Sequence, residues 1–172
     1  DTKYNENIPR SDRKNSNDNW YEWEIRAPEA IENTLVLMYD VIDQELIDKL
    51  QKGIDKQVPG IGTAATGANR LDNCQAAIIG GIVQQNPARL KMGTDALATE
   101  LVYSTIDDGF YKDGSFIQHH QYPYNGAYGA SALLSIARIL YLFDGTSFMS
   151  YLPDLRNAYQ WVYDLSLIHI SE

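Results

Sequence analysis

Two loops of this chain hold the residue types that carry out acid–base chemistry. The longer loop covers roughly residues 105–125 and is dense in Asp, Gly, Tyr and His. The other loop, PGIGTAATGAN at residues 59–69, is rich in small residues and forms helices poorly. Histidine exchanges a proton near neutral pH, and carboxylates act as acids and bases in hydrolysis. Because a loop of about 20 residues is uncommon in a compact helical protein unless it is functional, we expect the chemistry to lie on these loops.

The longer loop also contains groups that could support hydrolysis or metal binding, and their spacing disfavours both. Asp107, Asp108 and Asp113 could supply the carboxylate pair of a glycoside hydrolase, but the first two are adjacent and the third precedes a glycine. His119 and His120 are also adjacent, so their side chains diverge, and no third ligand has suitable spacing. We therefore expect neither a metal nor a cofactor.

Six helix-forming segments are expected to position the loops. Apolar residues recur at helical spacing after Pro28, after Asp43, from about Arg70 to Gln85, after Pro87, over about 127–143 and after Pro153. Proline suits the first turn of a helix, and aspartate suits the position before it. Strand-type alternation is nearly absent from the sequence. The pattern predicts an all-α chain of antiparallel helical hairpins.

Composition excludes several classes of function. The chain has 172 residues, of which 44% are hydrophobic, and a net charge of −9. These values suit a globular protein and oppose binding to nucleic acid or to an anionic membrane. No apolar run approaches the roughly 18 residues of a membrane span. Cys74 has no partner for a disulfide and is expected to be a small buried residue.

The chain is expected to divide into three parts. Residues 1–18 are polar and are interpreted as an irregular lead-in. Residues 19–165 hold the six helix-forming segments. Residues 166–172, SLIHISE, have no helix stop signal and are interpreted as a possible cloning- or sequencing-derived tail.

Three motifs follow one another in a fixed order along the chain. They are NWYEWEI at residues 19–25, TGANR at 66–70, and DGSFIQH followed by PYNGAYG at 113–129. Together they resemble the signature of polysaccharide lyase family 8, which includes hyaluronate, chondroitin AC and xanthan lyases. The resemblance covers roughly residues 19–150. It implies that residues 19–165 are part of an α-helical catalytic domain, a partial (incomplete) α/α toroid of helical hairpins around a cleft.

The resemblance also implies roles for individual residues. The family's catalytic asparagine, histidine and tyrosine fall on Asn69, His119 and Tyr128. The implied substrate-binding residues are Trp20, Tyr21, Arg70 and Asn125. Among these, Trp20 and Tyr21 would form a flat apolar platform that stacks on sugar rings.

The implied reaction, β-elimination next to a uronate, needs these three residue types. The C5 proton of a uronate is barely acidic while the neighbouring carboxylate keeps its charge. Amide donors from Asn69 would stabilise the enolate-like charge as it develops, and one such donor contributes about 3 kcal/mol. His119 suits the base that removes the C5 proton, and Tyr128 suits the acid that protonates the departing O4. Tyr128 could also perform both transfers with His119 assisting.

The expected function is therefore that of a carbon–oxygen lyase acting on uronate-containing acidic glycans of the hyaluronan or chondroitin type. A xanthan-type lyase is the alternative within the same chemistry. A glycoside hydrolase on a similar helical toroid, or a non-catalytic glycan-binding helical domain, are the alternatives from other classes. The resemblance also implies an extracellular or cell-surface location.

Some of the family's features differ here or lie beyond this chain. Arg26 stands where the family usually has a glycine, and Tyr21 stands where a second tryptophan is common. The family's catalytic arginine and a supporting glutamate lie further downstream, so the missing C-terminal part of the same polypeptide is an expected partner. A partial toroid leaves uncovered some apolar helix faces, such as that of Leu133, Ile136 and Leu140, so we expect exposed hydrophobic patches near the C-terminal helices and a tendency to associate.

Overall fold

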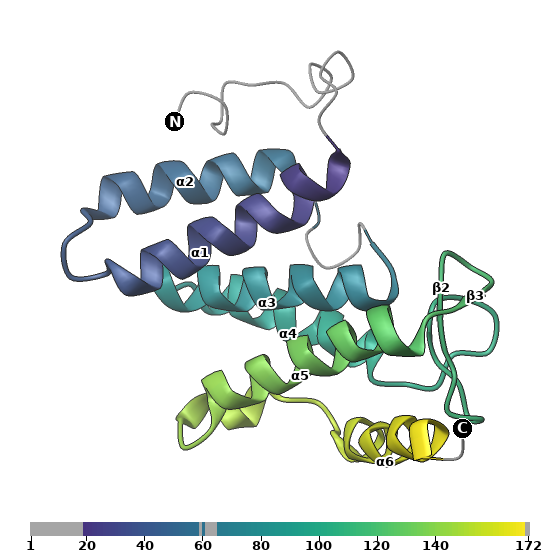
Figure 1. The fold of residues 1–172 in the computed structure, drawn as a ribbon. Coiled ribbons are helices and arrows are strands. Elements are labelled where there is room, and N and C mark those ends of the chain that lie inside the picture. The colour runs from purple at the N-terminus through teal and green to yellow at the C-terminus, as the bar shows by residue number, and fades with distance from the viewer. Residues whose placement is uncertain (1–18, 59, 61–64, 171–172) are drawn as a thin grey trace.

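The computed structural model describes residues 19–58, 60 and 65–170, and its helices lie largely in antiparallel pairs (Figure 1). The elements follow in the order η2 Glu22–Arg26, α1 Ala27–Leu37, α2 Gln44–Gln57, α3 Gly67–Val83, α4 Pro87–Glu100, β1 Gly109–Phe110, β2 Phe116–Gln118, β3 Tyr122–Pro123, η3 Asn125–Gly129, α5 Ala130–Phe143, η4 Ser147–Tyr151 and α6 Arg156–Ile170. η2 and η3 are π-helical turns that run directly into α1 and α5, and η4 is a 3-10 turn. The predicted lead-in, residues 1–18, lies outside the described residues.

The first hairpin pairs α1 with α2. Asp43 begins α2 as predicted, because its carboxylate accepts a hydrogen bond from the backbone N–H of Leu46 at 2.8 Å. The apolar spacing predicts a first helix that continues to Ile42, whereas α1 ends at Leu37. This prediction is wrong because residues 38–43 form the turn that lets α2 run back along α1.

α3 is the central helix and contacts α1, α4 and α5. It begins at Gly67, earlier than the predicted start at Arg70. Gly67 has a φ of 58°, a left-handed conformation that glycine adopts without strain, so the chain turns sharply into the helix there. The early start places Asn69 in the first turn of α3 rather than on the preceding loop.

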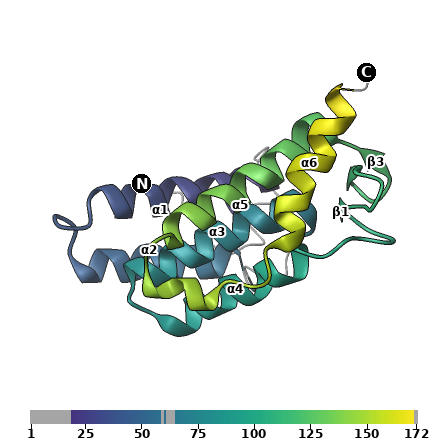
Figure 2. The ribbon, with the colours of Figure 1, turned by 90° about the horizontal axis from the view of Figure 1, so that it is seen from below.

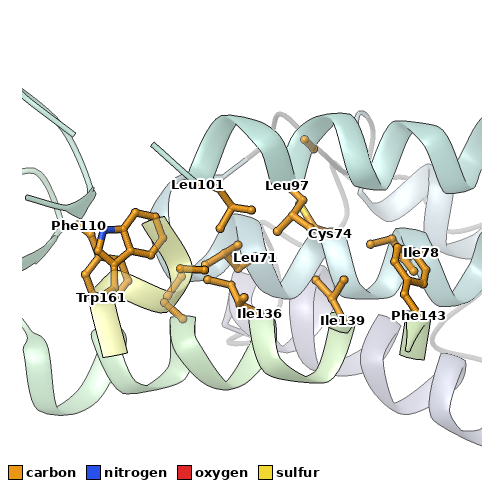
Figure 3. Close-up of a cluster of buried hydrophobic side chains, with 14 of the residues drawn as sticks. Leu71, Cys74, Ile78, Leu97, Leu101, Phe110, Ile136, Ile139, Phe143 and Trp161 are labelled. Atoms are coloured by element: carbon orange, nitrogen blue, oxygen red, sulfur yellow. The ribbon is translucent and has the colours of Figure 1, made fainter. Parts of the chain in front are cut away.

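The main core lies between α3, α4, α5 and α6 (Figure 3). Its buried side chains include Leu71, Ile78, Leu97, Ile136, Ile139 and Phe143. Trp161 of α6 stacks on Phe110 of β1 with ring centroids 4.4 Å apart, which joins the strands to the helices. Cys74 is fully buried here, and burial raises the pKa of its thiol to about 12. Its predicted role as a small core residue is confirmed.

The structure covers the apolar face of α5 that Leu133, Ile136 and Leu140 form. Ile136 is buried, and Leu133 and Leu140 pack against the main core. Among the side chains of α5 and α6 that the structure describes, which end at Leu165, the exposed large apolar ones are Leu134, Tyr141, Tyr159, Val162 and Tyr163. α5 carries apolar residues around most of its circumference, so periodicity alone does not decide which face meets the core. The predicted tendency to associate stays a prediction.

Among the described residues, one helical segment is long and apolar enough to cross a membrane, by its length and composition alone. It covers Asn125–Phe143, has a mean hydropathy of 1.4 over an 18-residue window, and is 33% buried over that window. It is not an unbroken apolar run in the sequence, because glycine, serine and tyrosine interrupt its apolar residues. Ala132, Ile136 and Ile139 of this segment pack into the main core, and core helices of globular proteins satisfy the same criteria.

The predicted long loop contains a small antiparallel sheet in the order β1–β2–β3. Gly109 pairs with Ile117, and Gln118 pairs with Tyr122. Sequence patterning missed these strands because each has only two or three residues, too few to show an alternation. The sheet lies at the end of the bundle where α3 and η3–α5 begin (Figures 1 and 2). It therefore brings His119, the residue after β2, to the same end.

The last helix, α6, extends beyond the boundary that the sequence predicts after residue 165. α6 extends to Ile170, so residues 166–170 continue a helix. The boundary predicted after residue 165 rests on the lack of a helix stop signal at 166–172, and a helix without a stop signal can continue. The interpretation of residues 166–172 as a tail of other origin stays a prediction.

Candidate active site

A cavity of about 420 Å³ opens at the end of the bundle where α3 and α5 begin. Its lining residues are Asn19, Trp20, Tyr21, Asn69, Asp72, His119, Ala127, Tyr128 and Ser131. They come from four segments: the chain leading into η2, the first turns of α3, the residue after β2, and η3–α5. The cavity therefore unites five of the seven predicted site residues, which are Trp20, Tyr21, Asn69, His119 and Tyr128.

Asn69 reaches this cavity from the first turn of α3 and is only 7% exposed. A Cβ atom on Gly67 would lie 2.5 Å from Gln118 Oε1, so the glycine allows the end of β2 to approach the start of α3 closely. The N-terminal turn of a helix carries partial positive charge from its backbone N–H groups. An amide donor in this turn thus lies in a field that favours negative charge on a bound molecule.

His119 and Tyr128 contact one another inside the cavity. His119 Nε2 lies 3.2 Å from Tyr128 Oη, and the two rings are nearly perpendicular with centroids 5.3 Å apart. A proton can lie on either side of this contact, depending on the histidine tautomer. His119 has a φ of 56°, which is uncommon for a residue with a side chain. The pair is therefore positioned for proton transfer at some cost in backbone strain.

The ring of Tyr124 contacts those of His119 and Tyr128, although Tyr124 is not among the site residues predicted from the sequence. Its ring centroid lies 6.1 Å from that of His119 and 5.3 Å from that of Tyr128, in edge-to-face geometry. Such contacts restrict the orientation of both partners. Its place inside the PYNGAYG motif could have indicated that it belongs to the site. The η3 turn follows Tyr124 directly and brings its ring into contact with that of Tyr128.

Trp20 and Tyr21 form an aromatic wall of the cavity. Their rings meet edge to face with centroids 6.0 Å apart, and Trp20 is 48% exposed. An exposed indole at a cavity offers a flat apolar surface for a sugar ring. Trp23 is half-buried, while Arg26 pairs with Glu22 at 3.0 Å on the exposed surface and does not line the cavity.

Asp72 of α3 adds an acidic side chain to the lining of the cavity. Burial raises the pKa of Asp72, although the Ser135 hydroxyl donates a hydrogen bond to its carboxylate at 2.6 Å and Arg138 acts in the same lowering direction. Burial, followed by the charge of Asp72, also raises the pKa of Glu29 and that of Tyr21. Asp72 is not among the site residues predicted from the sequence. Its position three residues after Asn69 places both on the same face once Asn69 is helical.

Arg70 and Asn125 do not line this cavity. The Arg70 guanidinium pairs with Glu100 at 2.9 Å, donates to the carbonyl of Ala65 at 2.6 Å, and lines a different cavity beside α4. Asn125 Oδ1 accepts a hydrogen bond from the backbone N–H of Phe116 at 2.6 Å and so joins η3 to β2. Both residues support the segments that carry the site, and their role in substrate binding stays a prediction without support from the geometry.

One group among the described residues brings possible metal ligands together. Ligand atoms of Asp107, Asp108 and His120 lie within 4.8 Å of one another. Asp107 Oδ1 contacts His120 Nδ1 at 2.9 Å, and Asp108 accepts a hydrogen bond from the backbone N–H of His120 at 2.7 Å. These hydrogen bonds explain why the groups lie close together, so the geometry gives no reason to assign a metal to them.

Comparison with known proteins places this arrangement in a family. The family model described as polysaccharide lyase family 8, N terminal alpha-helical domain, matches residues 3–169. A hyaluronate lyase of Thermasporomyces composti is 38% identical over 130 residues, which cover 75% of this chain and 17% of that protein.

Solved structures agree with this match. The xanthan lyase of Paenibacillus has a TM-score of 0.77 at 33% identity, over 94% of this chain and 15% of that one. The chondroitin AC lyase of Streptomyces coelicolor A3, solved in complex with chondroitin sulphate, has a TM-score of 0.76 at 30% identity, over 88% of this chain and 20% of that one. The chain thus spans a fifth or less of the length of these three relatives. It belongs to polysaccharide lyase family 8, within the N-terminal α-helical domain, and its hairpins form part of an incomplete α/α toroid.

Proposed function

We propose that this chain is the part of a polysaccharide lyase that carries the proton-transfer groups for β-elimination on uronate-containing acidic glycans of the hyaluronan or chondroitin type. One observation carries the proposal: Asn69, His119 and Tyr128 line one cavity, and His119 Nε2 lies 3.2 Å from Tyr128 Oη. A cavity with an amide donor, an imidazole and a phenol suits proton transfer at carbon next to a carboxylate.

The proposed reaction breaks two bonds and forms one double bond. A base removes the C5 proton, the electron pair forms the C4–C5 double bond, and O4 departs and takes up a proton. Asn69 donates hydrogen bonds to the uronate carboxylate and stabilises the charge that develops on it, helped by the N-terminal turn of α3. The His119–Tyr128 pair supplies the base and the acid, and both assignments within the pair are compatible with their contact.

The aromatic wall and the relatives support a polymeric sugar substrate. Trp20 offers a large exposed ring beside the reacting groups. Two of the relatives are named for hyaluronate and chondroitin, which favours these glycans. Xanthan is the second candidate substrate, because the Paenibacillus relative is a xanthan lyase.

The proposal includes the rest of a longer polypeptide. The relatives are several times longer than this chain, which supports a C-terminal part that supplies a further arginine and glutamate to the site. Among the lining residues Asp72 is acidic and none is Lys or Arg, so a cation from outside the chain would help the cavity to bind an anionic substrate. We also propose an extracellular or cell-surface location, because polymers of this kind are too large to enter a cell.

The decisive test is Tyr128→Phe in the longer polypeptide, assayed by the ultraviolet absorbance of the unsaturated product. Loss of the hydroxyl, with the ring retained, should lower kcat by about 100-fold or more and leave KM little changed. Tyr141→Phe is the matched control, because Tyr141 is 84% exposed on α5 and lines a different cavity.

The assay also separates the alternatives. New reducing ends without new absorbance would indicate a hydrolase. Unchanged glycan binding after alanine replaces Asn69, His119 and Tyr128, with no product from the parent protein, would indicate a non-catalytic binding domain. Full product formation by Tyr128→Phe would overturn the mechanism.

A further inference from the structure

A group of polar contacts joins the two segments that carry Asn69 and His119. It lies beside the cavity and consists of Thr66, Asp108 and Gln118, with the backbone of Ala68 and His120. None of these five residues lines the cavity. The proposed function above leaves this group without a role.

Asp108 is the centre of the group. One oxygen of its carboxylate, Oδ2, accepts hydrogen bonds from Thr66 Oγ1 and from Gln118 Nε2, each at 2.6 Å. The other oxygen, Oδ1, accepts the backbone N–H of His120 at 2.7 Å. A single side chain thus holds the residue before α3, the residue before His119 and the residue after His119.

Gln118 closes the group on the side of α3. Its Oε1 accepts the backbone N–H of Ala68 at 3.2 Å, and its Nε2 donates to Asp108 and, at 3.4 Å, to the carbonyl of Thr66. Gln118 is 1% exposed, so its hydrogen bonds are not shared with water. Ala68 and Gln118 are the residues immediately before Asn69 and His119. The hydrogen bond between them therefore holds the start of α3 against the end of β2.

The backbone that carries His119 needs such support. His119 and His120 have φ values of 56° and 68°, and two consecutive left-handed residues with side chains are unfavourable. Strained conformations persist where surrounding contacts hold them. The hydrogen bond from His120 N–H to Asp108 lies at this point.

We propose that Asp108 and Gln118 are positioning residues, which hold Asn69 and His119 in the relative placement that the elimination requires. The proposal rests on the proposed function, because it assigns the pair to the same reaction. Neither side chain touches the cavity, so both act through the segments that they join.

Asp108→Asn tests this role, because the amide cannot satisfy the group. In one orientation its nitrogen would face the Nε2 of Gln118, and in the other it would face the backbone N–H of His120, so a donor meets a donor in both. If the Gln118 amide turned over to accept in the first orientation, its nitrogen would face the N–H of Ala68 instead. Each arrangement breaks a contact that holds the start of α3 or the backbone beside His119, so kcat in the longer polypeptide should fall about 10- to 100-fold, with KM within about twofold.

The double variant Asp108→Asn with Gln118→Glu restores the pairing with the polarity exchanged. The amide at position 108 can donate to the carboxylate at 118, which can still accept the N–H of Ala68; only the longer hydrogen bond to the carbonyl of Thr66, at 3.4 Å, is lost. Gln118→Glu alone places two carboxylates against each other and should also lower kcat. The double variant should recover most of the lost kcat, which a loss of two independent contacts would not allow. Asp113→Asn is the control, since its hydrogen bonds to Ser115 remain within its own turn.

The measurements separate positioning from simple loss of folding and from failure of the proposed function. Each variant is assayed with the folded fraction measured by circular dichroism, and kcat is expressed per folded protein. Normal kcat per folded protein in Asp108→Asn, or a double variant no better than the worse single variant, would overturn the positioning role. If Tyr128→Phe retained full activity, the proposed function itself would be wrong, whatever the outcome for Asp108.

Discussion

Glu32 of α1 is a buried carboxyl group whose titration should make the stability of the fold depend on pH. It is 0% exposed, and Gln51 Nε2 donates to both of its oxygens at 2.9 Å. Burial raises its pKa from 4.5 to about 7, against the opposing effects of the Gln51 hydrogen bond and the charge of Arg89. The folded protein therefore binds a proton at Glu32 more tightly than the unfolded chain does.

The sign and size of the effect follow from this difference. Since the folded form holds the proton more tightly, the stability that Glu32 contributes is fully present below pH 4.5 and is lost as the pH rises to about 7. The shift corresponds to about 3 kcal/mol in the free energy of unfolding, at about 1.4 kcal/mol for each pKa unit. About one pH unit above this pKa the contribution should no longer change.

Glu32→Gln should remove this component of the pH dependence. The buried Gln51 Oε1 has no hydrogen-bond partner, and it can accept from the new amide. The variant should therefore match the parent chain near pH 5 and exceed it by up to about 3 kcal/mol at pH 8. Urea unfolding followed by tryptophan fluorescence at several pH values measures both proteins. Glu45→Gln is the control, because Glu45 pairs with Lys49 on the exposed surface of α2.

Other groups titrate in the same range, so the difference between the two proteins is the quantity to examine. Burial also raises the pKa of Glu29, Asp72 and Glu100, and these carboxyls are present in both. The stability difference between Glu32→Gln and the parent should grow between pH 5 and pH 7. A difference that stays constant over this range would refute the reasoning.

Three further substitutions have expected outcomes. Gly80→Ala should destabilise the fold by about 1–3 kcal/mol in urea unfolding. The new Cβ would lie 2.6 Å from Glu32 Oε1 and 2.7 Å from Arg89 Nε, which is too close. An unchanged unfolding midpoint would show that these two side chains move aside freely. Trp20→Ala should raise KM for the glycan with a smaller effect on kcat, as measured by initial rates, since it removes a binding surface that does not react; an effect on kcat alone would contradict that role. Asp72→Asn should lower KM for an acidic glycan by up to about fivefold at pH 8, because it removes a negative charge from the lining of the cavity. A higher KM would mean that Asp72 binds the sugar.

Much of the helical scaffold could be predicted from local patterns. Asp43 begins α2, and Pro87 begins α4 after its Asn86 cap, because capping depends on residues within one turn. The end of α1 and the small sheet could not be predicted in this way. The first depends on where the chain must turn back, and the second is made of pairings between strands too short to show a pattern.

By itself the sequence determined the chemical groups, their order and the family resemblance, because these depend on residue type and spacing alone. Only the tertiary structure decided that Asn69, His119 and Tyr128 line one cavity, while Arg70 turns to Glu100 beside α4. Spacing specifies which residues share a face of one helix. Which faces meet depends on packing and hydrogen bonds between distant segments, and no local pattern along the chain encodes those contacts.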